Sequence, residues 1–84
     1  MKIEKNSQHG VTTVHLIGHF QSEHIGELKN QLRHNGPQFV FDLTEVTLVD
    51  ADVVRFLGSC EVDGIGIANC SPYIREWIKQ ERKG

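Results

Sequence analysis

Polar and hydrophobic residues alternate in the N-terminal part of the chain, and this pattern predicts a β-hairpin. Residues 11–17 (VTTVHLI) are rich in β-branched side chains and predict a strand that ends at Gly18. Residues 2–4 predict an opening strand, and the polar run of residues 6–10 predicts a turn between the two strands. The two strands can therefore pair as a hairpin.

A helical period replaces the alternation after Gln21. Ser22 is the predicted N-cap, and Glu23 in the first turn suits the helix dipole. The segment 35–37 (NGP) predicts the end of this helix, because Gly accepts a left-handed conformation and Pro cannot continue a helix. The apolar residues recur at i, i+3 and i+7 and form one narrow stripe: Ile25, Leu28 and Leu32.

The middle of the chain predicts a buried strand followed by a second helix. Residues 39–43 (FVFDL) are nearly all apolar, which is typical of a central strand of a parallel sheet that is covered on both faces. Residues 44–49 predict a connecting loop. Asp50 is the predicted N-cap of the helix, which is expected to stop at Asp63 and Gly64. Its apolar residues at helical spacing are Val53, Phe56, Leu57 and Cys60.

A short strand and a last helix complete the predicted fold. Residues 65–69 alternate as a strand, and Ser71-Pro72 predicts a helix start with Ser as the cap. Ile74, Trp77 and Ile78 form the apolar face of that helix. The order β-β-α-β-α-β-α predicts one α/β domain over residues 1–84, a small four-stranded mixed sheet with the helices mainly on one face.

Composition and charge narrow the classes of function. The chain has 84 residues, 38% hydrophobic and 24% charged, with a formal net charge of −2. This balance does not favour a nucleic-acid partner, because phosphate-binding surfaces are usually basic. No apolar run reaches the roughly 20 residues of a membrane-spanning helix, and the first residues do not form a signal peptide. We therefore expect a cytoplasmic protein without membrane insertion, in which Cys60 and Cys70 are reduced thiols.

The usual signatures of catalysis and metal binding do not occur, so we expect no enzyme, no cofactor and no metal. The segment from Cys70 to Arg75 is one residue shorter than the Cys-x5-Arg loop of phosphatases. Ser22 and Ser71 are explained as helix caps, and Gly64-Ile65-Gly66 leads into a strand, without the third glycine of a nucleotide loop. We expect no metal site among the histidines, because the pair spaced i, i+4, His15 and His19, straddles the end of a predicted strand and does not lie on a helix. The five histidines are His9, His15, His19, His24 and His34.

Two acidic residues stand where the buried strand leads into the second helix. Asp50 caps the helix, and Asp52 in the first turn complements the helix dipole. These roles account for both residues by local physics. A recognition or switch position at the same place is the alternative, and local physics does not separate the two.

Residues 39–50 (FVFDLTEVTLVD) resemble the strand and loop of STAS domains, the sulfate-transporter and anti-sigma-factor-antagonist family. Gly18, Phe20 and residues 67–72 (IANCSP) match further parts of the pattern in the family's order, over nearly the whole chain. The resemblance implies a βα fold with a small mixed sheet. For stand-alone bacterial members it also implies partner switching, in which phosphorylation of a Ser or Thr at the helix start ends binding to an anti-sigma kinase.

The chain departs from the family pattern at the switch position. The resemblance aligns Asp50 with the family's Asp, and it places Ala51 at the first Ser and Asp52 at the phosphoacceptor. Val53 replaces the following Gly, and Gln21 stands where many members carry Asp. Because Asp52 has no hydroxyl, the usual phosphorylation switch is expected to be absent. Asp52 is then either an imitation of the phosphorylated form or only part of the helix start.

These observations predict a non-enzymatic protein–protein interaction module with a role in signalling regulation. Its partner-binding or switch residues are expected to be Asp50, Asp52, Arg55 and Ser59, which share the loop and helix of residues 48–59. The partner is expected to be a protein that resembles an anti-sigma kinase.

Two alternatives remain open for the function. One is a STAS subunit or regulatory domain of a lipid ABC or anion transporter, which would contact a transporter ATPase; an exposed apolar patch on residues 53–62 would favour it. The other is a small-anion or nucleotide-binding module, which ranks lower because Asp50 and Asp52 repel phosphate. Trp77 and Tyr73 either pack within the fold, with Trp77 on the sheet, or contribute to a homodimer contact.

Overall fold

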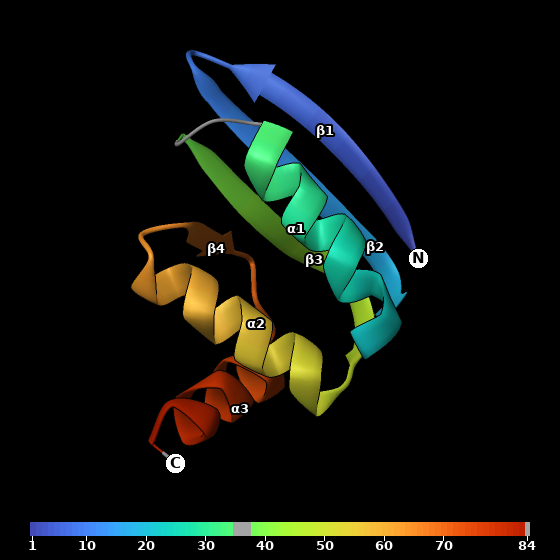
Figure 1. Cartoon of the computed structure of the whole chain (residues 1–84), viewed down its shortest axis with the longest axis vertical. Helices are drawn as coiled ribbons and strands as arrows, with labels where there is room; N and C mark the ends of the chain where they lie inside the picture. The colour runs from blue at the N-terminus through green and yellow to red at the C-terminus, as the bar shows by residue number, and fades with distance from the viewer. Residues whose placement is uncertain (35–37, 84) are drawn as a thin grey trace.

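A computed structural model describes residues 1–34 and 38–83 of the chain (Figure 1). Its elements are β1 (Lys2–Gln8), β2 (Val11–Phe20), the short 3-10 helix η1 (Ser22–His24), α1 (Ile25–His34), β3 (Phe39–Val49), α2 (Ala51–Val62), β4 (Gly66–Ala68) and α3 (Pro72–Lys83). The strands form one four-stranded sheet in the order β1-β2-β3-β4. The prediction of a small α/β fold with a mixed sheet is therefore confirmed.

Strands β1 and β2 form an antiparallel hairpin, whereas β2–β3 and β3–β4 are parallel pairs. The hairpin turn contains only His9 (φ 53°) and Gly10 (φ 80°), both in the left-handed region. Such a two-residue turn matches the right-handed twist of the flanking strands. The predicted turn over residues 6–10 was too long, because Asn6 pairs with Thr13 and Ser7 with Thr12.

Helices α1 and α2 lie in front of one face of the sheet in Figure 1, and α3 packs mainly against α2. The core lies between these helices and the sheet. Val40 and Asp42 alternate with the core residues of β3 and point to the opposite face, so β3 is not covered equally on its two faces. The fully buried side chains of the core include Val14, Leu16, Phe20, Leu28, Phe41, Val53, Val54, Leu57, Ile74 and Ile78.

Strand β3 is longer than predicted, since residues 44–49 continue the strand instead of forming a loop. They pair with β2, which itself extends to Phe20 instead of ending at Gly18. Val46 lies opposite Gly18 and Val49 opposite Phe20, with register shifts on both sides of Ile17 and Gly18. Gly18 has a φ of 97°, which a glycine adopts without strain at such an irregularity. Pairing with a distant strand thus overrides the polar pattern of residues 44–47.

Two of the three predicted helix caps are confirmed. Asp50 caps α2, and the Ser71 hydroxyl accepts a hydrogen bond from the Ile74 backbone N–H at 3.4 Å. Ser22 is not a cap, because Gln21 is the N-cap of η1 and its backbone N–H donates to His24 Nδ1 at 3.0 Å. Helix α2 ends at Val62 as expected, whereas the predicted end of α1 at residues 35–37 lies outside the described residues.

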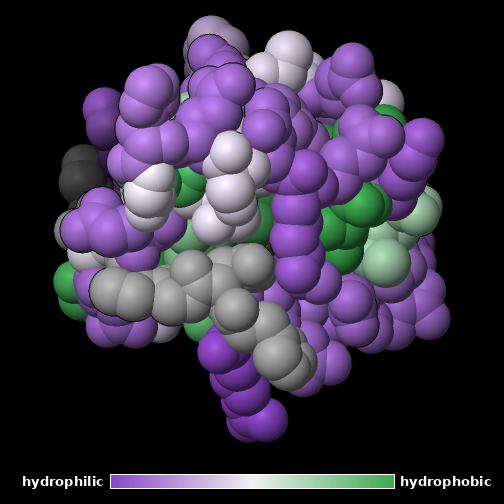
Figure 2. Space-filling view, turned by 90° about the horizontal axis from the view of Figure 1, so that it is seen from above, coloured by the Kyte–Doolittle hydropathy of each residue, from purple (hydrophilic) through white to green (hydrophobic). Residues whose placement is uncertain are grey.

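Figure 2 shows the end of the molecule that carries the β1–β2 turn. Hydrophilic side chains cover most of this end, and hydrophobic atoms are visible only in patches between them. Within the residues that the structure describes, no helix is both long and apolar enough to cross a membrane.

Candidate partner-binding surface on helix α2

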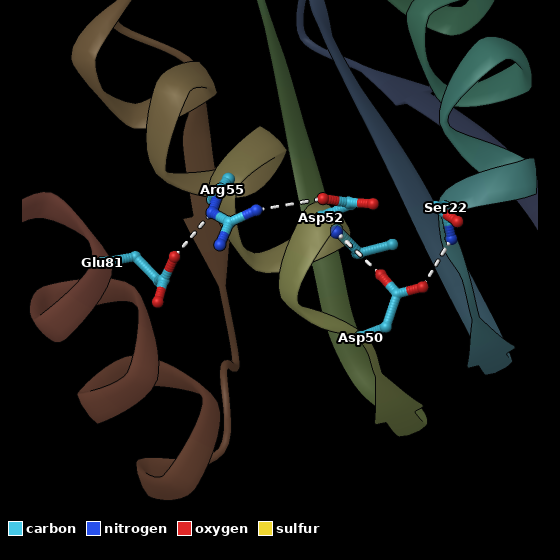
Figure 3. A network of polar contacts seen from close by, with 6 residues as sticks. Ser22, Asp50, Asp52, Arg55 and Glu81 are labelled. Atoms are coloured by element: carbon cyan, nitrogen blue, oxygen red, sulfur yellow. Dashed lines mark hydrogen bonds and ion pairs between the residues drawn. The ribbon is translucent and has the colours of Figure 1, made fainter.

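Asp50 joins the starts of two helices through its carboxylate. Oδ1 accepts a hydrogen bond from the Val53 backbone N–H at 3.0 Å, and Oδ2 accepts one from the Ser22 backbone N–H at 2.7 Å (Figure 3). The hydrogen bond from Val53, with that from Ser22, holds the pKa of Asp50 below its ordinary value. Asp50 therefore stays ionised at neutral pH and fixes the first turn of α2 against the beginning of η1.

Asp52 points away from this junction and contacts Arg55 one turn further along α2. Arg55 Nη1 donates to Asp52 Oδ1 at 3.1 Å, and Arg55 Nε donates to Glu81 Oε1 of α3 at 2.7 Å (Figure 3). The side chains of Asp52 and Arg55 are 56% and 61% exposed. The hydrogen bond and the charge of Glu81 raise the pKa of Arg55. Arg55 thus links the first turn of α2 to α3 while its guanidinium remains open to solvent.

Ser59 is exposed and lies one turn after Arg55 on α2. Both residues line a groove between α2 and α3. The groove has a volume of about 210 Å³. Its lining residues are Val54, Arg55, Gly58, Ser59, Val62, Ile78 and Glu81. We use the name "α2 surface" for Asp52, Arg55 and Ser59 together with this groove.

The structure brings three of the four predicted site residues to one surface. Asp52, Arg55 and Ser59 belong to the α2 surface, whereas the carboxylate of Asp50 faces η1 and serves as a cap. Glu81 completes the ionic group but was not predicted, because it lies 26 residues from Arg55 in the sequence. Only the packing of α3 on α2 brings Glu81 next to Arg55.

A second polar cluster, around Asp42, was also missed from the sequence. Asp42 is only 9% exposed, and its Oδ1 accepts hydrogen bonds from the backbone N–H and hydroxyl of Thr44 and from Asn69 Nδ2. His15 Nδ1 lies 3.1 Å from Asp42 Oδ2. The one signal in the sequence was an acidic residue within the apolar run 39–43, because a buried carboxylate requires partners.

The charge of Asp42 is stabilised by these neighbours. Burial alone raises the pKa of Asp42, but the hydrogen bonds from Thr44 and Asn69, with the nearby His15, outweigh burial and lower the pKa below its ordinary value. Asp42 lies beside a cavity of about 300 Å³ on the sheet face that α1 and α2 leave open. His15, Glu4 and Glu45 contribute to the cavity lining. The cluster thus ties β2, β3 and the segment after β4 together.

Neither cysteine forms a disulfide, and the histidines that the structure describes do not gather into a metal site. Cys60 and Cys70 are free thiols, and burial raises the pKa of Cys60 to about 11, so that it is not a thiolate nucleophile at neutral pH. Among residues 1–34 and 38–83, no group of three or more His, Cys, Asp or Glu side chains is arranged to hold a metal ion.

Comparison with known proteins gives no assignment: no family model matches the chain, and no curated protein matches it.

Proposed function

We propose that the chain is a STAS-type protein–protein interaction module without enzymatic activity, which binds a regulatory partner through the α2 surface. The resemblance of residues 39–50 to the STAS strand and loop supports the class of module. The partner is a protein related to the anti-sigma kinases, and no cofactor takes part.

The observation that carries this proposal is the exposed ionic group beside a groove on α2. Asp52 and Arg55 stand in solvent, and neither is needed to cap the helix, because Asp50 performs that role. Arg55 and Ser59 line a groove whose floor includes Val54 and Gly58. An apolar depression rimmed by charged groups is the kind of surface that gives a protein interface both affinity and specificity.

The partner is expected to bind without a phosphorylation switch at residue 52. A phosphate adds roughly two negative charges to an interface, whereas the Asp52 carboxylate carries one permanent charge that Arg55 already contacts. Phosphorylation at residue 52 therefore does not switch the module between a binding form and a non-binding form.

The experiment is a comparison of bait proteins in extract of the native host. Tagged wild type, Asp52→Lys and Asp52→Ser are compared, and retained proteins are identified by mass spectrometry. Glu27→Lys is the matched control, because it reverses an exposed charge on α1, outside the α2 surface. The partner is then purified, and its Kd for each variant is measured by calorimetry.

Asp52→Lys is expected to lose the partner, whereas Glu27→Lys retains it. Asp52→Ser retains the partner and becomes a substrate for an anti-sigma kinase, detected as an added phosphate in the intact mass. If wild type, Asp52→Lys and Glu27→Lys retain the same proteins with the same Kd, the proposal is wrong and Asp52 serves only the helix start.

A second candidate is a STAS subunit that binds the ATPase of an ABC transporter. One observation favours it: Val62 at the end of α2 is 68% exposed and adjoins the apolar part of the groove with Ile78. Exposed apolar residues beside a groove suit a permanent subunit contact. Val62→Asp separates the candidates, because it is expected to abolish retention of an ATPase and only to weaken a contact centred on Asp52 and Arg55.

A further inference from the structure

We propose that β4 and α3, residues 66–83, form a C-terminal cover that opens as one unit while the rest of the sheet stays closed. We also infer that Arg55 couples this opening to the α2 surface. The second part rests on the proposed function, whereas the opening itself does not.

The cover is attached to the sheet by a very short strand. Strand β4 pairs with β3 only over Gly66–Ala68, opposite Val40–Asp42. Strands β1, β2 and β3 contain 7, 10 and 11 residues. Segments with few ladder hydrogen bonds open at lower free energy than long central strands. Among the strands that the structure describes, β4 is thus the one that separates most readily.

Helix α3 packs mainly against α2. Its buried residues Ile74 and Ile78 belong to the core, and Ile78 faces Val54 and Gly58 of α2 across the groove. Removing α3 would therefore uncover an apolar stripe on the side of α2 while leaving the side of α2 that packs on the sheet in place. Phe56, in ring contact with Phe41 of β3, illustrates that second side.

Among the side chains that the structure describes, three polar contacts cross the boundary between the cover and the remaining chain, which we call the seam. Asn69 Nδ2 donates to Asp42 Oδ1 at 3.3 Å, Arg75 Nη1 lies 2.6 Å from Glu61 Oε2, and Arg55 Nε lies 2.7 Å from Glu81 Oε1. Asn69 has a φ of 56°, a left-handed conformation that costs free energy in a residue other than Gly. The side-chain contact with Asp42 offsets part of that cost. Two of the three contacts are ion pairs with partly exposed members.

Arg55 belongs to both the seam and the α2 surface. Its guanidinium contacts Asp52 through Nη1 and Glu81 through Nε. A partner carboxylate that binds Arg55 competes with Glu81 and removes an ion pair that holds α3. Because coupling between two equilibria is reciprocal, opening of the cover in turn frees Arg55 for the partner.

Hydrogen–deuterium exchange followed by mass spectrometry tests the cover on the protein alone. Wild type is compared with Arg75→Gln and Arg55→Gln. Lys2→Gln is the control, because it breaks an exposed ion pair with Glu4 within β1, outside the seam. In wild type, amides of residues 66–83 are expected to exchange faster than those of β2 and β3. Arg75→Gln is expected to raise exchange in residues 66–83 about tenfold and to leave β2 and β3 unchanged.

Arg55→Gln is expected to act in the same direction with a smaller effect, since this pair is more exposed than Arg75–Glu61. Lys2→Gln is expected to change nothing in residues 66–83. Exchange of the wild-type protein is also measured at NaCl concentrations from 0.05 to 0.5 M, which requires no variant. Because salt screens the ion pairs of the seam, it should raise the exchange rate in the cover and not in β2 and β3.

Equal protection of residues 66–83 and of β2 and β3 in wild type, at all salt concentrations, would overturn the cover. A uniform rise over the whole chain in Arg75→Gln would do the same, because it indicates global unfolding only. If Arg55→Gln leaves residues 66–83 unchanged while Arg75→Gln acts on them, the coupling is wrong and the cover stands. None of these results depends on a binding partner, so they are independent of the test of the proposed function.

Discussion

Asp42 and Asp52 are carboxylates with basic neighbours, yet they stand in opposite surroundings. Asp42 is 9% exposed and contacts side chains from three parts of the fold, whereas the side chain of Asp52 is 56% exposed and contacts Arg55 of its own helix. A buried carboxylate cannot lose its partners without a large penalty, but an exposed one exchanges them for water at little cost. Asp42 therefore stabilises the fold, whereas Asp52 is available to bind a partner.

The largest expected effect comes from removing the buried carboxylate. Asp42→Ala leaves the Thr44 backbone N–H, Asn69 and His15 without their acceptor, so we expect a loss of about 3 kcal/mol in the free energy of unfolding. Urea denaturation of the variant and of wild type measures this difference. Asp42→Asn, which keeps the side-chain volume and one acceptor oxygen, should lose less, and equal losses would mean that the negative charge of the carboxylate, not the single acceptor oxygen, matters at this position.

Loss of Asp50 is expected to have the second largest effect on stability, since Asp50 caps α2 and holds the start of η1. Asp50→Ala removes the acceptor for the backbone N–H groups of Val53 and Ser22. We expect the melting temperature to fall by about 5 °C, the usual consequence of losing an N-cap in a domain of this size. Asp50→Asn, which can still accept, should recover most of the fall; a variant as stable as wild type would contradict the cap.

Acid should weaken the fold through the same two carboxylates. Their pKa values are lower in the folded chain than in the unfolded chain, so the stabilisation they supply is present above the unfolded value, near 3.8, and is lost as the pH falls through the folded values. Denaturation between pH 5 and pH 2.5 should show stability decreasing with acid. Asp42→Asn should flatten this slope; an unchanged slope would show that Asp42 does not contribute to it.

The smallest effect on stability is expected at Asp52, the exposed carboxylate in the comparison with Asp42. Asp52→Ala removes a surface ion pair with Arg55, and we expect the melting temperature to change by less than about 2 °C. Differential scanning calorimetry measures this change, and Ser59→Ala on the same surface serves as a neutral reference. A fall as large as that of Asp50→Ala would place Asp52 among the residues that hold the fold and would weaken its assignment to a binding surface.

The candidate surface was predictable in part. Asp52, Arg55 and Ser59 lie on one helix, so the helical period alone places them near one another. Glu81 and the apolar wall at Ile78 come from α3 and could not be deduced, because nothing local specifies how α3 packs on α2. The same holds for Asp42, whose partners His15 and Asn69 lie 27 residues on either side of it.

The sequence by itself determined the order of the strands and helices, the apolar stripes and the caps at Asp50 and Ser71, because these depend on neighbours within a few residues. Only the tertiary structure decided that residues 44–49 are a strand, that the hairpin turn is two residues long, and that Gln21 replaces Ser22 as the cap. Pairing of residues 44–49 with β2, and the hydrogen bond from Ser22 to Asp50, bring together groups far apart in the chain, and the free energy of these contacts exceeds local preference. The length of the turn follows from the register of the β1–β2 pairing, which the alternation of residues does not specify.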